Sequence, residues 1–207
     1  MMRKILSTIA LLFLVGTQLA AWQSQPPGAK SPAPIFLLNA GEHLLCGKSR
    51  DGKIELQDGT QFKALSAEAM KVYEEWDYHD HLSITRNTMP MGGSEYYIAN
   101  LDKSGEFVHA NFLSEPYMHG PYTQFINYID PFDGEVSVFN NNGNEFWWQI
   151  DKNDLLLLKG WKKNDRILIG KNDLWIEKMR SDCEFVMMNV DKTYLPHLRV
   201  SPISNNH

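Results

Sequence analysis

Short runs of alternating apolar and polar residues recur along the chain, and two of them lead into matching turns. The run Ile54–Leu56 precedes Asp58–Gly59, and the run Val136–Val138 precedes Asn142–Gly143. Alternation with period two is typical of a half-buried strand, and an Asp-Gly or Asn-Gly pair after it is typical of a tight hairpin whose two central residues have positive φ. The pattern predicts two similar β-hairpins in separate parts of the chain.

Two further blocks repeat after these hairpins. With the hairpins counted as the first block, the second block recurs without a gap. It reads Trp76, Asp80, Leu82, Ile84 and Asn87 in one copy and Trp161, Asp165, Ile167, Ile169 and Asn172 in the other. A third block aligns Tyr97–Asn111 with Trp175–Asn189, again without a gap. Three blocks in the same order predict an internal duplication in which Lys53–Leu113 and Glu135–Val190 are copies of one supersecondary unit.

Each copy has the pattern of a small β unit with one helical insert. Ser66–Tyr73 and Asp151–Leu158 both open with a residue suited to an N-cap, which indicates a short helix or helical turn. His81–Thr85, Tyr96–Leu101 and Phe107–Phe112 alternate well enough to be strands. We therefore expect a mainly β protein of two tandem small barrels, SH3-like or OB-like, each with a short helical insert.

Composition and charge agree with a globular protein that does not bind nucleic acid. The 207 residues are 43% hydrophobic and 12% aromatic, and the formal net charge is −5. The first copy carries five basic and ten acidic residues, whereas Glu135–Lys192, the second copy with its next two residues, carries nine basic and ten acidic ones. The acidic balance gives no support to a nucleic-acid partner.

The N-terminus has the pattern of an export signal. Arg3–Lys4 precede the apolar run Ile5–Val15, and small residues follow up to Ala21. We expect a signal peptide over residues 1–21, a secreted or periplasmic protein, and no stable membrane span after cleavage. An uncleaved N-terminal membrane anchor is the alternative.

The remaining chain divides by composition. The expected parts are a Pro-rich linker over 22–34, a first β repeat over 35–113, an aromatic-rich connector over 114–134, a second β repeat over 135–192 and a C-terminal tail over 193–207.

The connector is too aromatic to be a solvated linker. It contains Tyr117, Tyr122 and Phe125 among other apolar residues. An extra strand or helical turn that seals the seam between the barrels is the first interpretation, and an aromatic ligand groove is the second.

The two cysteines allow a bridge between the copies. Cys46 precedes the first copy, and Cys183 falls in the second copy at the place that the alignment gives to Gly105, which suggests a turn. In an exported protein they form either a disulfide or two half-buried thiols.

Four regularly repeated residues are candidates for either function or structure. Trp76 and Trp161 are followed by Asp80 and Asp165 at the same spacing. We interpret the Trp as a core anchor and the Asp as a turn residue that accepts backbone hydrogen bonds, because a catalytic group need not occur once per copy.

The copies differ in the loop after Asn87, where the alignment leaves a seven-residue excess over Thr88–Ser94. Met89 and Met91 lie in this loop, with His79 and His81 nearby in sequence. Thioether and imidazole ligands suit copper or another borderline metal, so these four residues are candidate metal ligands and the loop a candidate binding element. Alternatively, the methionines cap the core and the histidines are solvated turn residues.

No catalytic motif is present, and no residue is assigned a catalytic role. The chain lacks the nucleophile elbow, zinc-protease, P-loop and dinucleotide patterns. A dyad formed by His109 or His119 with a distant carboxylate stays open. The sequence requires no cofactor.

The duplicated motif resembles the repeat of uncharacterised exported bacterial proteins built from small β-rich units. In that repeat a Gly often precedes the Asp, whereas this chain has His79 and Asn164 there. The resemblance implies an envelope or secreted address and a β fold. The expected function is an exported binding or structural module with a protein or envelope component as partner. A periplasmic metal-handling protein and an envelope hydrolase are the alternatives.

Overall fold

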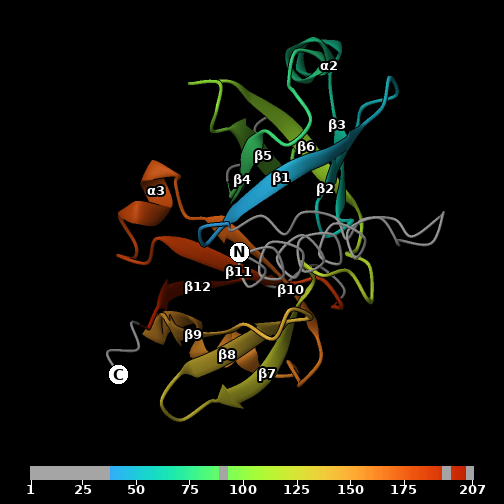
Figure 1. The fold of residues 1–207 in the computed structure, drawn as a ribbon. Helices are drawn as coiled ribbons and strands as arrows, with labels where there is room; N and C mark the ends of the chain where they lie inside the picture. The colour runs from blue at the N-terminus through green and yellow to red at the C-terminus, as the bar shows by residue number, and fades with distance from the viewer. Residues whose placement is uncertain (1–37, 89–92, 193–196, 204–207) are drawn as a thin grey trace, which may run out of the picture. The chain divides into compact units, whose positions relative to one another are not determined.

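The structure is a computed structural model that describes residues 38–88, 93–192 and 197–203 (Figure 1). The expected signal peptide and most of the linker lie outside these ranges. The chain is mainly β, as predicted, with one closed six-stranded antiparallel barrel, six further strands that form a second sheet region, and few short helices. Within the described part, none of the helices is long and apolar enough to cross a membrane.

The first barrel closes by pairing its first strand with its fourth. Its elements are β1 (Glu42–Lys48), β2 (Lys53–Leu56), β3 (Gln61–Ala64), α2 (Ala67–Glu74), β4 (His81–Arg86), β5 (Tyr96–Asn100) and β6 (Phe107–Ser114). The strand order is β1-β2-β3-β6-β5-β4, and β4 pairs back with β1. Closure leaves no free edge in this barrel.

The second sheet region repeats this order of pairing. Its elements are β7 (Gln124–Asp130), β8 (Glu135–Asn140), β9 (Glu145–Ile150), η1 (Lys152–Leu158), β10 (Arg166–Lys171), α3 (Trp175–Lys178), β11 (Phe185–Asn189) and β12 (His197–Pro202). The strand order is β7-β8-β9-β12-β11-β10, and β10 also pairs with β7 through Arg166 with Phe125 and Ile167 with Gln124.

Two expected connecting segments contain strands. Strand β7 lies in the region expected to be a connector, and β12 lies in the region expected to be a tail. In β12, Leu198 and Val200 are buried and alternate with half-buried residues, so this strand has an apolar face to cover. Its polar neighbours and two prolines conceal that pattern in the sequence.

The third sequence block was aligned to the wrong strand. Strand β11 pairs with β10 as β5 pairs with β4, so Phe185 occupies the position of Tyr96 and not that of Phe107. The expected insertion over Thr88–Ser94 is therefore also wrong. The connection from β4 to β5 spans residues 87–95, whereas the connection from β10 to β11 spans residues 172–184 and contains α3. One alternating strand resembles another too closely for a short match to assign it.

The predicted helical inserts are present, and their caps explain where they begin. The Ser66 side chain accepts a hydrogen bond from the backbone N–H of Ala69 at the start of α2. Asp151 does the same for Asn153 at the start of η1. Both caps satisfy backbone donors that have no partner inside the helix.

The predicted hairpins form with a different turn. Gly59 has φ of 89° and Gly143 has φ of 81°, but Asp58 does not share the positive φ that a two-residue turn of this type requires. Instead, the Asp58 carboxylate accepts the Thr60 N–H at 2.9 Å inside a longer loop. Gly59 also has a packing role, because a Cβ there would lie 2.3 Å from the Tyr117 ring.

Two apolar clusters fill the molecule. The first contains Trp76, Phe62 and Tyr73, and the second contains Trp148, Trp161 and Ile126. The first cluster also includes three residues of the second sheet region, namely Leu168, Met188 and Val190. The second sheet region therefore packs against the first barrel with apolar side chains.

Candidate functional site

The candidate site lies on the outer face of strands β4, β5 and β6. Leu82, Ile84 and Ile98 of these strands are fully buried in the first cluster. Since side chains alternate along a strand, their neighbours face outward. We call five of these residues the open face: Ser83, Thr85, Tyr97, Ala99 and Phe107. Of these, Phe107 is exposed, Tyr97 and Ala99 are half-buried, and Ser83 and Thr85 are buried at the base of the face.

The open face lines a groove of about 310 Å³. Asp173 and Leu174, which lie just before α3, line it together with the open face. Its volume is at the lower end of the range found for small-molecule sites. The groove therefore depends on the long β10–β11 connection as well as on the first barrel.

Aromatic rings form the wall of the groove. The ring centroids of Tyr97 and Phe107 are 5.9 Å apart with an interplanar angle of 67°, and Phe107 is 51% exposed. The His109 ring lies 4.7 Å from Tyr97 and 5.7 Å from Phe107. Edge-to-face contacts of this kind hold the rings in place while one face stays accessible.

A buried polar chain fixes the ring of His109. Its Nδ1 lies 2.8 Å from the Ser94 hydroxyl, which accepts a hydrogen bond from the Asn87 amide at 3.0 Å. Ser94 is only 1% exposed. The Ser94 hydroxyl is poorly placed to attack a substrate, because it is buried and already hydrogen-bonded. The possible dyad of His109 required a carboxylate as partner, whereas the partner found here is a serine. The hydrogen bonds that run from Asn87 through Ser94 hold the His109 ring against Tyr97 and Phe107.

The corresponding face of the second sheet region is covered. Matching strand pairs give the residues that correspond to the open face, and we call them the covered face: Leu168, Gly170, Val186, Met188 and His197. Leu168 and Met188 pack into the first cluster. A Cβ on Gly170 would lie 2.4 Å from the carbonyl oxygen of Ile84, so only glycine allows β10 to approach β4 this closely.

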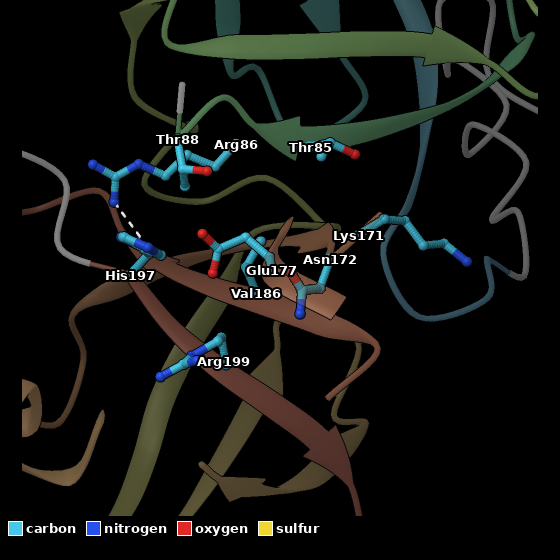
Figure 2. A pocket seen from close by; sticks show the side chains of 9 residues that line it. All are labelled: Thr85, Arg86, Thr88, Lys171, Asn172, Glu177, Val186, His197 and Arg199. Atoms are coloured by element: carbon cyan, nitrogen blue, oxygen red, sulfur yellow. Dashed lines mark hydrogen bonds between the residues drawn. The ribbon is translucent and has the colours of Figure 1, made fainter. Parts of the chain in front are cut away.

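A small polar pocket remains beside the covered face (Figure 2). Thr85, Arg86 and Thr88 from the first barrel meet Glu177 and His197 there. Its space of about 10 Å³ is enough for roughly one water molecule. Arg86 Nη1 donates to His197 Nε2 at 3.1 Å, which requires that nitrogen to be the unprotonated one. The pocket is too small to hold a ligand.

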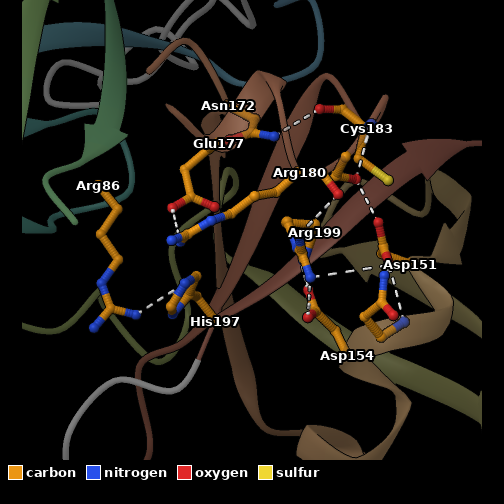
Figure 3. A network of polar contacts seen from close by, with 11 residues as sticks. Arg86, Asp151, Asp154, Asn172, Glu177, Arg180, Cys183, His197 and Arg199 are labelled. Atoms are coloured by element: carbon orange, nitrogen blue, oxygen red, sulfur yellow. Dashed lines mark hydrogen bonds and ion pairs between the residues drawn. The ribbon is translucent and has the colours of Figure 1, made fainter. Parts of the chain in front are cut away.

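Ion pairs hold the strand behind this pocket (Figure 3). Arg199 of β12 makes a two-point contact with Asp154 of η1, at 2.8 Å from Nε and 2.6 Å from Nη2. These bonds raise the pKa of Arg199. Asp151 accepts a hydrogen bond from the Ser181 hydroxyl. Burial raises the pKa of the Asp151 carboxyl, but the hydrogen bonds from Ser181 and Asn153 outweigh burial, so the pKa lies below its usual value. Charged bonds of this geometry are strong, so the network is structural.

A buried histidine joins the two parts of the sheet. His43 of β1 is fully enclosed, and its Nε2 lies 2.8 Å from the Ile169 carbonyl oxygen in β10. Since a carbonyl only accepts, Nε2 carries the proton, and Nδ1 is left to accept from Gln57 at 3.3 Å. Burial lowers the pKa of His43, and burial raises the pKa of the nearby Asp58.

The candidate metal ligands are not brought together in the part of the chain that can be described. Met89 and Met91 lie outside the described residues. His79 is exposed in a turn with φ of 73°, and His81 bonds to Asp102 at 3.1 Å. Among the described residues, no group of three or more His, Cys, Asp and Glu side chains could hold a metal ion.

The candidate aromatic ligand residues of the connector have structural contacts. Tyr117 packs on Gly59 and donates its hydroxyl to Glu55 at 2.8 Å. Phe125 is 7% exposed and stacks on Phe139 with centroids 5.5 Å apart. Tyr122 is half-buried. None of the three lines the groove described above.

The repeated Trp and Asp residues have matching surroundings. Trp76 is fully buried and donates from its ring nitrogen to Glu106 at 2.8 Å, and Trp161 is 7% exposed. Asp80 accepts the backbone N–H of Asp77, and Asp165 accepts that of Lys162. Each carboxylate thus closes the turn before it, as expected for a turn residue that accepts backbone hydrogen bonds.

Both cysteines are free thiols in this structure. Cys46 is exposed at an irregularity in β1, and Cys183 is half-buried in the β10–β11 connection. The possible bridge between them is not formed. Cys183 accepts the Asn172 amide through its carbonyl as Ser94 does for Asn87, so its place corresponds to Ser94 and not to Gly105.

Sequence reasoning missed the groove residues, although one signal pointed to them. The strands of the open face were expected, and their outward positions include Tyr97 and Phe107, which are unusually aromatic for a solvated face. Asp173 and Leu174 could not be found, because only the fold brings them to this wall. No family model, curated protein or solved structure matches this chain.

Proposed function

We propose that the chain is an exported binding module made of two tandem copies of one small barrel, and that the groove over the open face is its ligand site. The observation that carries the proposal is the difference between two corresponding sheet faces. One face is closed by packing, and the other carries the exposed Phe107 and the half-buried Tyr97 on a groove of about 310 Å³. Exposed aromatic residues gathered at a concave site mark binding more often than structure.

The tandem arrangement is supported by strand pairing. Strands β1–β6 and β7–β12 follow the same order, with the first strand paired to the fourth in both sets. A helix or helical turn follows the third strand each time. This order favours an OB-like type over an SH3-like one, with one strand more than the usual five.

Hydrogen bonds at corresponding places also support duplication. Asn100 donates to Asp80 at 2.6 Å, and Asn189 donates to Asp165 at 2.8 Å. His79 and Asn164, which precede these aspartates, both have positive φ, at 73° and 69°. A left-handed residue there accounts for the glycine often found in the resembling repeat.

The export role is supported by the N-terminal signal pattern of the sequence alone. An exported module with an aromatic groove is suited to hold an envelope component. The apolar contact between the two sheet regions keeps Asp173 and Leu174 at the groove.

Photo-crosslinking inside cells tests this function. Benzoylphenylalanine at position 107 should give a specific adduct with an envelope component, because this side chain lines the groove. The matched control is position 132, where Phe132 is 93% exposed in the β7–β8 turn, compared with 51% for Phe107. An adduct at 132 with none at 107, or none at either, would contradict the proposal.

A further inference from the structure

The rings of the groove wall are arranged to attract a cation. Tyr97 and Phe107, the two rings that line the groove, meet at 67°, so their planes are not parallel. The face of an aromatic ring carries partial negative charge, and a cation within about 6 Å of its centre is attracted. Inclined rings can surround a compact cation from more than one side.

The charge of the residues that line the groove also favours a cation. Asp173 is the charged residue among the described residues that line the groove, and these include no Lys, Arg or His. His109 contacts the two rings but does not line the groove. Asp173 contacts Lys178 at 3.3 Å, but both side chains are more than half exposed. An exposed pair of this kind contributes little, so the carboxylate can accept a second cation. The first copy is also the acidic one.

The groove is also too apolar for a hydrated metal ion or an anion. Ala99, Leu174 and the two rings supply carbon surface, while the cationic side chains Arg86 and Lys171 line the small pocket, which shares Thr85 with the groove. A cation with its own apolar surface matches both properties. Quaternary ammonium groups are the ligands that aromatic sites with a nearby carboxylate recognise in this way.

We infer that the groove binds a small organic cation, with an alkylated ammonium group held against Tyr97 and Phe107 and its charge balanced by Asp173. This inference rests on the proposed binding function and names its ligand class.

The test is a titration of the purified exported protein with choline, followed by the amide NMR shifts of Ala99 and Phe107. The neutral compound 3,3-dimethylbutan-1-ol, which has the same shape, is titrated in parallel. Choline should move both amides in a saturable way at millimolar concentration, and the neutral compound should bind more weakly.

Three variants and one control define the site. Tyr97→Leu should weaken choline binding roughly 3- to 30-fold, the range for loss of a cation–π contact, whereas Tyr97→Phe should retain binding. Asp173→Asn should weaken it about two- to fivefold, as for an exposed charge pair. Tyr128→Leu is the control, because Tyr128 is 50% exposed on β7 and lies away from the groove lining.

Each opposite result overturns the inference. Equal binding of the neutral compound with no effect of Asp173→Asn would show an apolar site without charge recognition, and the binding function would stand if position 107 still gave its adduct. Absence of saturable shifts at Ala99 and Phe107, or binding unaffected by Tyr97→Leu, would remove the organic cation from the groove. A missing adduct at 107 would instead remove the binding function itself.

Discussion

The open face and the covered face occupy the same place in two similarly paired sets of strands. One lines a groove, whereas the other packs against the first barrel. Ser83, Thr85 and Ala99 on the open face correspond to Leu168, Gly170 and Met188 on the covered face. Leu168 and Met188 are large and apolar, and Gly170 has no side chain, so all three suit close packing against the first barrel. The corresponding residues of the open face are small or hydroxylated and lie beside the half-buried Tyr97 and the exposed Phe107. The side chains at corresponding positions thus suit one face to packing and the other to the ligand site that we propose.

The largest effect is expected at the two tryptophans, which test whether the two sets of strands are built alike. Trp76→Ala and Trp161→Ala should each lower the free energy of unfolding by about 3–5 kcal/mol, because both rings lie in apolar clusters. Urea denaturation measures this. A loss below about 1 kcal/mol at either site would place that ring on the surface and end the correspondence.

A second comparison separates the two tryptophans. Trp76→Phe leaves Glu106 without its ring N–H donor, whereas no partner for the Trp161 ring nitrogen is found among the described residues. Trp76→Phe should therefore be the more destabilising of the two Phe variants.

The next effect is expected at Gly170 and tests the covered face. Gly170→Ala should lower the free energy of unfolding by about 1–3 kcal/mol, since the new Cβ would lie 2.4 Å from the carbonyl oxygen of Ile84. That oxygen cannot move away unless the backbone of β4 moves with it. Thr85→Ala, at the corresponding place on the open face, should cost less. Equal costs in thermal or urea unfolding would show that β10 does not approach β4 closely.

The smallest effect is a pH dependence from the histidine that joins β1 to β10. Burial lowers the pKa of His43, so the unfolded chain binds a proton near pH 6.5 while the folded protein does not. His43 therefore reduces stability as the pH falls below about 6.5. The raised pKa of Asp58 acts in the opposite direction, because its folded carboxyl takes up a proton at higher pH than the unfolded one.

Comparison with His43→Gln isolates the histidine. Between pH 7 and 5, stability of the wild type should decline relative to that of the variant, measured by urea unfolding at each pH. A difference that stays constant over this range would mean that His43 is not buried in its neutral form.

Much of the fold follows from local sequence patterns, and most of the site does not. The alternation in His81–Arg86 and the caps Ser66 and Asp151 identify their elements because each acts within a few residues. Strand β11 was assigned to the wrong partner because alternation identifies a strand but not its neighbour.

The groove required tertiary structure. Tyr97 and Phe107 are visible as aromatic residues on strands, but Asp173 comes from a connection that appeared short when β11 was misaligned. The residues favoured from sequence, such as Tyr117 and Phe125, were chosen for aromatic density, and density does not distinguish a ring packed on Gly59 or Phe139 from one that faces a ligand.

Thiol accessibility tests the central claim most directly, because it compares the two faces without any ligand. Ala99→Cys and Met188→Cys place a thiol at corresponding positions, in a chain where Cys46 and Cys183 are both changed to Ser. Ala99 is half-buried at the groove and Met188 is 1% exposed. We expect the thiol at 99 to react readily with a thiol reagent and the thiol at 188 to react only as the protein unfolds. Equal rates in the folded protein, or a faster reaction at 188, would contradict the account.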